Sequence, residues 1–188
     1  MFNGKALYQP KGRSGEYSQW AVNFYNGCTG GCEYCYNKRF PVLSAPKPTL
    51  KACFKDEQNA IDIAYREIAE HKLQILTDGG VFLSFVSDPC LPETIPLTMS
   101  LAKTCSCFYQ SQIGNKLPIP IILLTKQADW VLDTESENHK WLMSYLSCAE
   151  LFKETPFLWN NVAFGFTLTG HDELEPGCSS NADRIKAM

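Results

Sequence analysis

The sequence predicts an α/β protein in which helices cover a mainly parallel sheet. Four stretches have the composition of buried strands, and each is followed by residues with helical periodicity. Repeated strand-then-helix units imply right-handed crossovers, which make neighbouring strands parallel. Hydrophobic residues make up 45% of the 188-residue chain, which is enough for one well-packed domain rather than a disordered segment.

The first half of the chain supplies a lead-in, a strand and a helix. Residues 1–18 carry glycine, proline and charged residues without a period, so we expect an irregular segment that packs on the edge of a domain formed by residues 19–188. Residues 20–25 alternate in size and polarity, which predicts a short strand running into a cysteine-rich loop. Asp56 is placed to cap a helix that ends near His71, with one buried face formed by Ile61, Ala64, Tyr65, Ile68 and Ala69.

The second half repeats the strand-then-helix unit. Buried strands are predicted at residues 81–86, 118–124 and 162–168, and the chain closes with the first turns of a helix from Asn181. Between these strands lie two helical patterns. Their buried faces consist of Leu97, Leu101, Thr104, Cys105 and Phe108 in the first, and Trp141, Leu142, Tyr145, Leu146 and Ala149 in the second.

The densest chemistry lies in residues 26–36, Asn-Gly-Cys-Thr-Gly-Gly-Cys-Glu-Tyr-Cys-Tyr. The three thiols of Cys28, Cys32 and Cys35 are separated by three and then two residues, and the intervening glycines allow the backbone to fold tightly around one centre. Thiolates are soft ligands, so the candidate centres are an iron–sulfur cluster or zinc. Three ligands instead of four indicate a site that keeps one position open for chemistry.

A closed metal site is the alternative interpretation. In that case Cys53 or a histidine supplies a fourth ligand, and the protein is a noncatalytic metal-binding module; an inactive remnant that retains the motifs is a further possibility. The other cysteines are predicted to be packing residues. They are Cys53, Cys90, Cys105, Cys107, Cys148 and Cys178, of which only Cys90 lies close enough to the proposed site to be a catalytic candidate.

Polar residues follow each predicted strand. Ser87-Asp88 comes after the second strand, Thr125-Lys126 after the third and Thr167 to Thr169 after the fourth, while the first strand leads into the cysteine loop. Ligands of parallel sheets gather at the carboxyl ends of the strands. We therefore expect these residues to share one site.

The spacing Cys-x3-Cys-x2-Cys, with an aromatic residue before the third cysteine, resembles the signature of the radical S-adenosylmethionine (radical SAM) enzymes. Further pieces are similar to the spore photoproduct lyase-like branch, and they occur in that family's order over nearly the whole chain. These pieces are Glu16-Tyr17-Ser18, residues 23–28, residues 32–36, Ser87-Asp88-Pro89 with Pro92-Glu93, Leu124-Thr125-Lys126, Glu175-Pro176-Gly177 and Arg184-Ile185.

This resemblance implies a partial (β/α) barrel that stops after about the fourth of six strands. It also implies that Cys28, Cys32 and Cys35 ligate a [4Fe–4S] cluster whose fourth iron binds SAM. Reduction then cleaves SAM to a 5′-deoxyadenosyl radical, which abstracts hydrogen from an unknown substrate in a lyase-like reaction. The implied cofactor-binding residues are Tyr34 and Tyr36 beside the third ligand, the latter near the adenine; Ser87 and Asp88 at the SAM amino group; Lys126 at its carboxylate; and Thr167 or Thr169 at the ribose.

Two features depart from the family pattern. The photoproduct lyases carry a hydrogen-donating cysteine just before the Ser-Asp step, where this chain has Phe85-Val86. A six-stranded barrel also needs two more strand units than this chain provides. We therefore expect either a fragment or a protein completed by another polypeptide, and its fourth strand would otherwise be an open apolar edge.

Composition restricts the class of partner and the cellular compartment that we expect for the protein. A formal net charge of -3 gives no general attraction to nucleic acid, so a nucleic-acid substrate is implied only by the family resemblance. Nine cysteines, an odd number, do not form a complete disulfide framework, and the sequence has neither a signal peptide nor a membrane-spanning run. We expect a cytoplasmic protein that receives electrons from a donor such as flavodoxin or ferredoxin.

Overall fold

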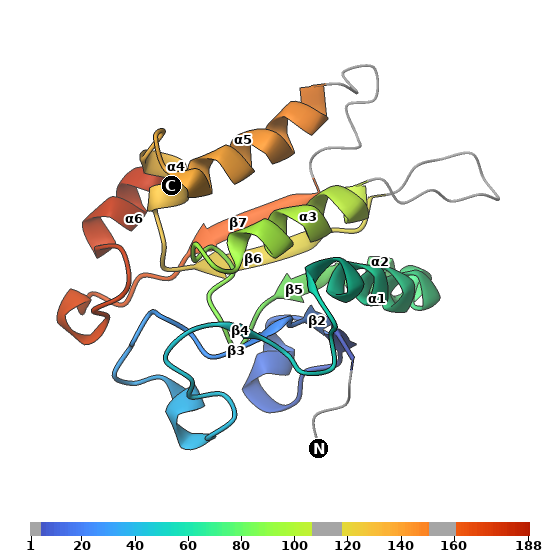
Figure 1. Cartoon of the computed structure of the whole chain (residues 1–188), viewed down its shortest axis with the longest axis horizontal. Helices are drawn as coiled ribbons and strands as arrows, with labels where there is room; N and C mark the ends of the chain where they lie inside the picture. Colours follow the sequence, from blue (N-terminus) through green and yellow to red (C-terminus); the bar gives the residue numbers. More distant parts are fainter. Residues whose placement is uncertain (1–4, 107–117, 151–160) are drawn as a thin grey trace.

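The protein is a layered α/β structure (Figure 1). The computed structural model describes residues 5–106, 118–150 and 161–188, with the backbone alone described for 148–150. Its main sheet has five strands in the order β1-β2-β5-β6-β7, and β1 alone is antiparallel to its neighbour. The strands are β1 (Leu7–Tyr8), β2 (Ala21–Val22), β5 (Val81–Leu83), β6 (Ile121–Thr125) and β7 (Val162–Phe166).

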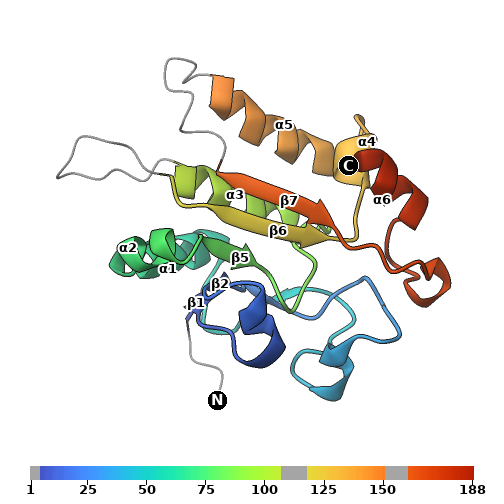
Figure 2. The same ribbon diagram turned by 180° about the vertical axis from the view of Figure 1, so that it is seen from behind.

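Helices pack on one face of this sheet. In Figure 1, α3 lies in front of β6 and β7, and in the opposite view of Figure 2 these strands lie in front of α3. The parallel order of β2, β5, β6 and β7 confirms the predicted strand-then-helix units. The helices are α1 (Glu57–Glu70), α2 (Lys72–Thr77), α3 (Ile95–Ser106), α4 (Asp129–Leu132), α5 (Glu137–Glu150) and α6 (Asn181–Ala187).

Helix α1 begins where the sequence predicts. The side chain of Asp56 accepts a hydrogen bond of 2.7 Å from the backbone N–H of Asn59, which satisfies one of the free donors in the first turn. The buried positions of this helix recur three and four residues apart, so that one stripe faces the core. They are Ala60, Ile61, Ala64 and Ile68.

The core fixes the sheet against the helices. Alternate residues of β6, Ile121 and Leu123, are fully buried on the helix side, as expected for a period of two. They belong to a cluster that also contains the apolar faces of α1 and α3. A second cluster surrounds Trp130 of α4, which is also fully buried, and holds α5 against the sheet. These two clusters therefore hold the strands, whose ends carry the polar residues, against the helices.

Several predicted elements differ in the structure. The lead-in is not wholly irregular, because Leu7–Tyr8 adds β1 to the sheet. The predicted strand at residues 20–25 is divided into β2 and β3 (Tyr25–Asn26), and β3 pairs separately with β4 (Thr49–Leu50). The short helices α2 and α4 have no counterpart among the predicted elements. Cys107 and Phe108, and the side chains of Cys148 and Ala149, lie outside the described residues.

Strand β7 forms the outer edge of the described sheet. The side chain of Phe164 in this strand is 50% exposed and Leu168, just beyond it, is 46% exposed. This agrees with the predicted apolar edge. Within the described ranges, no helix combines the length and apolar character needed to span a bilayer.

Candidate metal and cofactor site

The cysteine loop follows β3 and begins at a glycine, where any side chain would collide with neighbouring backbone atoms. Gly27 has a φ of +84°, and a Cβ placed on it would lie 2.3 Å from the carbonyl oxygen of Lys47 and 2.6 Å from that of Ala45. The backbone N–H of Cys28 donates a 3.2 Å hydrogen bond to the Ala45 carbonyl. The loop is thus pressed against residues 45–47, and this contact positions its first thiol.

The three predicted ligands line one cavity of about 280 Å³ at the carboxyl ends of the strands. Gly30 lies at its wall, and a Cβ there would be 3.4 Å from the sulfur of Cys28 and 3.8 Å from that of Cys32. The bare Cα of Gly30 therefore leaves room for the sulfurs. Cys35 lines the same cavity, so all three thiols share it as predicted.

A fourth thiol, which the sequence interpretation assigned to packing, also lines this cavity. The sulfur of Cys178 lies 3.8 Å from that of Cys32 and 3.2 Å from the position that a Cβ would take on Gly30. The prediction that Cys178 is a packing residue is wrong, because the segment after β7 folds back onto the cysteine loop. Figures 1 and 2 both show this red segment at the same end of the molecule as the blue loop that follows β3.

A chain of charged groups extends from Cys32 into the interior. The Lys126 ammonium lies 3.3 Å from the Cys32 sulfur and 2.9 Å from the Glu175 carboxylate. The other oxygen of Glu175 accepts a 2.7 Å hydrogen bond from the Arg184 guanidinium, and the side chains of both residues are fully buried. Arg184 also donates to the Thr167 carbonyl at 2.7 Å and the Lys126 carbonyl at 3.2 Å. This network joins the ends of β6 and β7 to α6.

The electrostatics of the site favour the thiolate form of Cys32. A hydrogen bond from Cys178 and the nearby Lys126 ammonium lower the pKa of Cys32 to about 6, although partial burial opposes them. The same pairing raises the pKa of Cys178. Burial raises the pKa of Cys28. In the metal-free protein, Cys32 and Cys178 thus act as a pair that shares one proton.

Replacing Lys126 by Met should raise the pKa of Cys32, because the variant loses the ammonium that stabilises the thiolate. At pH 7 most wild-type Cys32 is ionised, so we expect its alkylation by iodoacetamide in metal-free protein to slow several-fold in the variant. Peptide mass spectrometry measures the rate at each cysteine, and the exposed thiol of Cys53 serves as the internal reference. Equal Cys32 rates in the two proteins would contradict this assignment.

The two polar residues after β5 are engaged by the protein. Ser87 is buried, and its hydroxyl donates a 2.6 Å hydrogen bond to the Gly27 carbonyl, which ties the strand end to the cysteine loop. Asp88 accepts hydrogen bonds from the hydroxyl of Thr125 at 2.6 Å, from the N–H of Lys126 at 2.7 Å and from the N–H of Cys90 at 2.9 Å. Burial raises the pKa of Asp88 while these bonds lower it. Both residues line the cavity and also fix its walls.

The tyrosines and threonines lie around the same cavity. Tyr34 and Tyr36 are half-exposed wall residues; the hydroxyl of Tyr34 donates to Glu175 and that of Tyr36 to the Phe85 carbonyl. Thr167 also lines the cavity. Thr169 is not among the lining residues, and its hydroxyl donates a 3.0 Å hydrogen bond to Glu175.

Two other cysteine expectations are not supported by this geometry. Cys90 is fully buried in the apolar cluster around Trp130 and does not line the cavity, so the structure does not bring it to the thiols. Burial also raises the pKa of Cys90 well above its ordinary value. Cys53 lies in an exposed turn before α1 and is likewise absent from the cavity wall. The fourth thiol near the site is therefore Cys178 and not Cys53.

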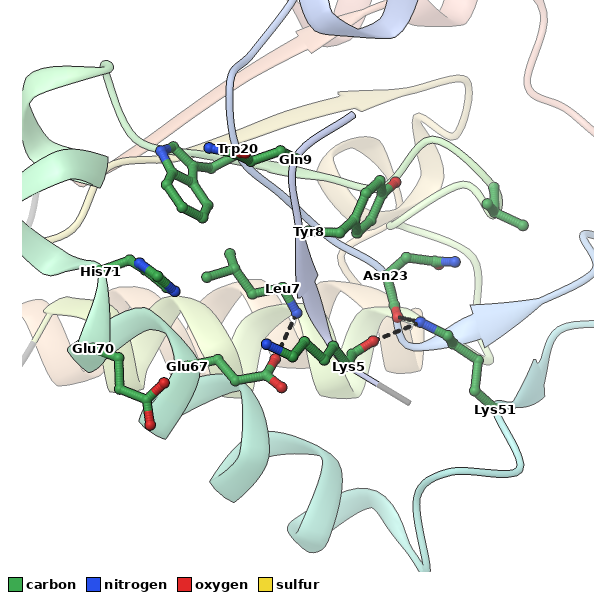
Figure 3. A pocket seen from close by; sticks show the side chains of 11 residues that line it. Lys5, Leu7, Tyr8, Gln9, Trp20, Asn23, Lys51, Glu67, Glu70 and His71 are labelled. Atoms are coloured by element: carbon green, nitrogen blue, oxygen red, sulfur yellow. Dashed lines mark hydrogen bonds between the residues drawn. The ribbon is translucent and has the colours of Figure 1, made fainter. Parts of the chain in front are cut away.

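A larger cavity of about 500 Å³ lies beside β1 and α1 (Figure 3). Two of its charged side chains, Lys51 and Glu67, bind backbone groups and hold segments of the chain together. The Lys51 ammonium donates to the carbonyls of Lys5 and Asn23 at 3.0 and 2.8 Å, and one Glu67 oxygen accepts from the N–H groups of Ala6 and Leu7. No thiol lines it. We therefore locate the candidate site in the smaller cavity.

The thiols that line the cavity suit an iron–sulfur group better than a single metal ion. Over the ranges 5–106, 118–150 and 161–188, no group of three or more His, Cys, Asp or Glu side chains is arranged to hold a metal ion. The thiols share a cavity without converging on one ion position. Their chemistry and the space left by Gly30 suit a larger thiolate-bound iron–sulfur group.

The sheet topology is that of an α/β fold of the radical SAM type, present here as part of a (β/α) barrel. No protein-family model and no curated protein matches the sequence.

Solved structures of spore photoproduct lyase do match its fold. One, a tyrosine-to-phenylalanine mutant, has a TM-score of 0.59 and 14% identity over 95% of this chain. Another, a double mutant with bound AdoMet (SAM) and dinucleoside spore photoproduct, has a TM-score of 0.57 and 15% identity over 96% of this chain. This chain covers 44% and 43% of those two chains, respectively.

Proposed function

We propose that this protein is a radical SAM enzyme. Cys28, Cys32 and Cys35 would hold a [4Fe–4S] cluster, which supplies the electron that cleaves SAM to a 5′-deoxyadenosyl radical when both are bound. The observation that carries this proposal is the shared cavity: three thiols with radical SAM spacing lie beside the cation Lys126 at the strand ends. The likeness to a spore photoproduct lyase structure with bound AdoMet supports SAM as the second cofactor.

The remaining wall residues would bind and orient SAM. Lys126 is the cation available to the SAM carboxylate, since its side chain reaches the cavity from the end of β6. Ser87 and Asp88 would bind the SAM amino group. Their hydrogen bonds to Gly27 and Thr125 also hold the cavity wall in place. Tyr36 is an exposed ring suited to an adenine face, and Thr167 is better placed than Thr169 for a ribose hydroxyl.

The substrate would enter from the open side of this cavity and lose a hydrogen atom. The dinucleoside in the related structures suggests a nucleic acid, but we do not propose thymine-dimer repair. Phe85 and Val86 stand where the family resemblance would place the hydrogen-donating cysteine. The free thiols of the described cysteines suit a reducing cytoplasm, where flavodoxin or ferredoxin could supply the electron.

Anaerobic reconstitution with iron and sulfide tests this proposal. We expect the wild-type chain to take up both, and the EPR spectrum of the reduced cluster to change when SAM is added. Formation of 5′-deoxyadenosine would demonstrate turnover. Replacement of Cys28, Cys32 or Cys35 by Ala should abolish stable cluster binding, whereas Cys53→Ser should not. Tightly bound zinc in place of iron would contradict the proposal, as would a reduced cluster whose EPR spectrum does not change when SAM is added.

A further inference from the structure

Among the residues that the structure describes, Cys178 is the only thiol in the cavity wall that lies outside the cysteine loop. Its sulfur lies 3.8 Å from that of Cys32, and the sulfurs of Cys178, Cys28 and Cys32 all lie within 4 Å of the position that a Cβ would take on Gly30. Cys178 is partly buried, lines the cavity and belongs to neither apolar cluster of the core. A thiol in this position can reach a metal group bound by its neighbours.

The backbone around Cys178 is built to hold it there. The N–H of Gly177 donates a 3.1 Å hydrogen bond to the Gly30 carbonyl, and a Cβ on Gly177 would lie 2.2 Å from the Thr29 carbonyl oxygen. The Gln127 side chain donates to the Gly177 carbonyl at 2.9 Å. Such a close approach of two backbones requires glycine and leaves the following side chain little freedom.

One cation lies directly beside the thiols. The Lys126 ammonium contacts Cys32 and also pairs with Glu175, which Arg184 bonds from the other side. Asp88 is a second carboxylate in the cavity wall, so these two cations are balanced by two carboxylates. Lys126 is the group that would stabilise thiolates bound to a cluster at this position.

We propose that Cys178 is a fourth thiolate ligand of the cluster held by Cys28, Cys32 and Cys35, and that it occupies the position to which SAM binds. This inference rests on the proposed function, because it requires that cluster. In the absence of SAM, Cys178 would coordinate the otherwise open iron and so prevent its loss from the cluster. SAM would replace it by ligand exchange, in which no electrons are gained or lost.

Controlled oxidation of the reconstituted protein tests this role without an activity assay. An iron that lacks a protein ligand is lost first on oxidation with ferricyanide, which leaves a [3Fe–4S] cluster with its own EPR signal. We expect the wild type to give little of this signal without SAM, and Cys178→Ala to give several-fold more. The Cys178→Ser variant should resemble Cys178→Ala, because a hydroxyl is a poorer ligand for iron than a thiolate. Cys53→Ser is the matched control and should behave as wild type.

SAM titration gives a second readout. The SAM-dependent change in the EPR spectrum should occur at several-fold lower SAM concentration in Cys178→Ala than in wild type, because no thiolate has to be displaced. Equal [3Fe–4S] yields and equal SAM dependence would overturn the role of Cys178 while leaving the three-cysteine cluster intact. Failure of every protein to take up iron and sulfide would overturn both this inference and the proposed function.

Discussion

Replacing Arg184 by Met is expected to destabilise the protein by about 3–5 kcal/mol, the usual cost of removing one partner from a buried ion pair. The guanidinium is fully buried and bonds Glu175, Thr167 and Lys126. The variant would leave the Glu175 carboxylate with Lys126 as its one remaining cation in the described chain, and would leave the two carbonyls without this donor. Urea unfolding followed by circular dichroism measures the loss.

Lys186→Met is the matched control, since it removes an exposed cation from the same helix. We expect its free energy of unfolding to stay within about 0.5 kcal/mol of wild type. If Arg184→Met cost no more than this control, the network from Cys32 to α6 would contribute little to stability. The close packing of residues 175–178 on the cysteine loop would then need another explanation.

Replacing Gly27 by Ala should be the second large effect. A residue with a side chain is strained at positive φ by about 1–2 kcal/mol. The new methyl group would also collide with the carbonyl oxygens of Lys47 and Ala45, and overpacking of this kind adds about 1–3 kcal/mol. Because the collision pushes the loop that carries Cys28 away from residues 45–47, we expect reduced iron uptake as well as a lower free energy of unfolding.

The Gly79→Ala variant separates the cost of backbone strain from the cost of the collision. Gly79 has a φ of +90°, close to that of Gly27, but no atom lies within 4 Å of its missing Cβ. We expect Gly79→Ala to cost only the backbone strain and to bind iron normally. Equal losses in the two variants would show that contact with residues 45–47 does not position the cysteine loop.

The elements that the sequence predicts correctly are those governed by local rules. The start of α1 follows from Asp56 and a regular apolar stripe. The meeting of Cys32, Asp88 and Lys126 follows from the geometry of parallel strands, whose carboxyl ends share one edge. Both predictions need only short-range patterns and a topological rule.

The features that the sequence interpretation misses depend on tertiary contacts. Strand β1 has two residues, too few to display a period, and forms because β2 offers a free edge. Cys178 reaches the site only because the backbone turns back after β7. Gly177 beside this cysteine was the one available signal, since a glycine next to a reactive side chain can mark close backbone contact.

The contact between Cys32 and Cys178 also sets an order of events during synthesis. The two residues are 146 positions apart in the sequence. The cysteine loop is synthesised first, and Cys178 can line its cavity only after the segment beyond β7 has been made and has packed against the loop. Until then, a nascent chain would expose the thiols of the cysteine loop.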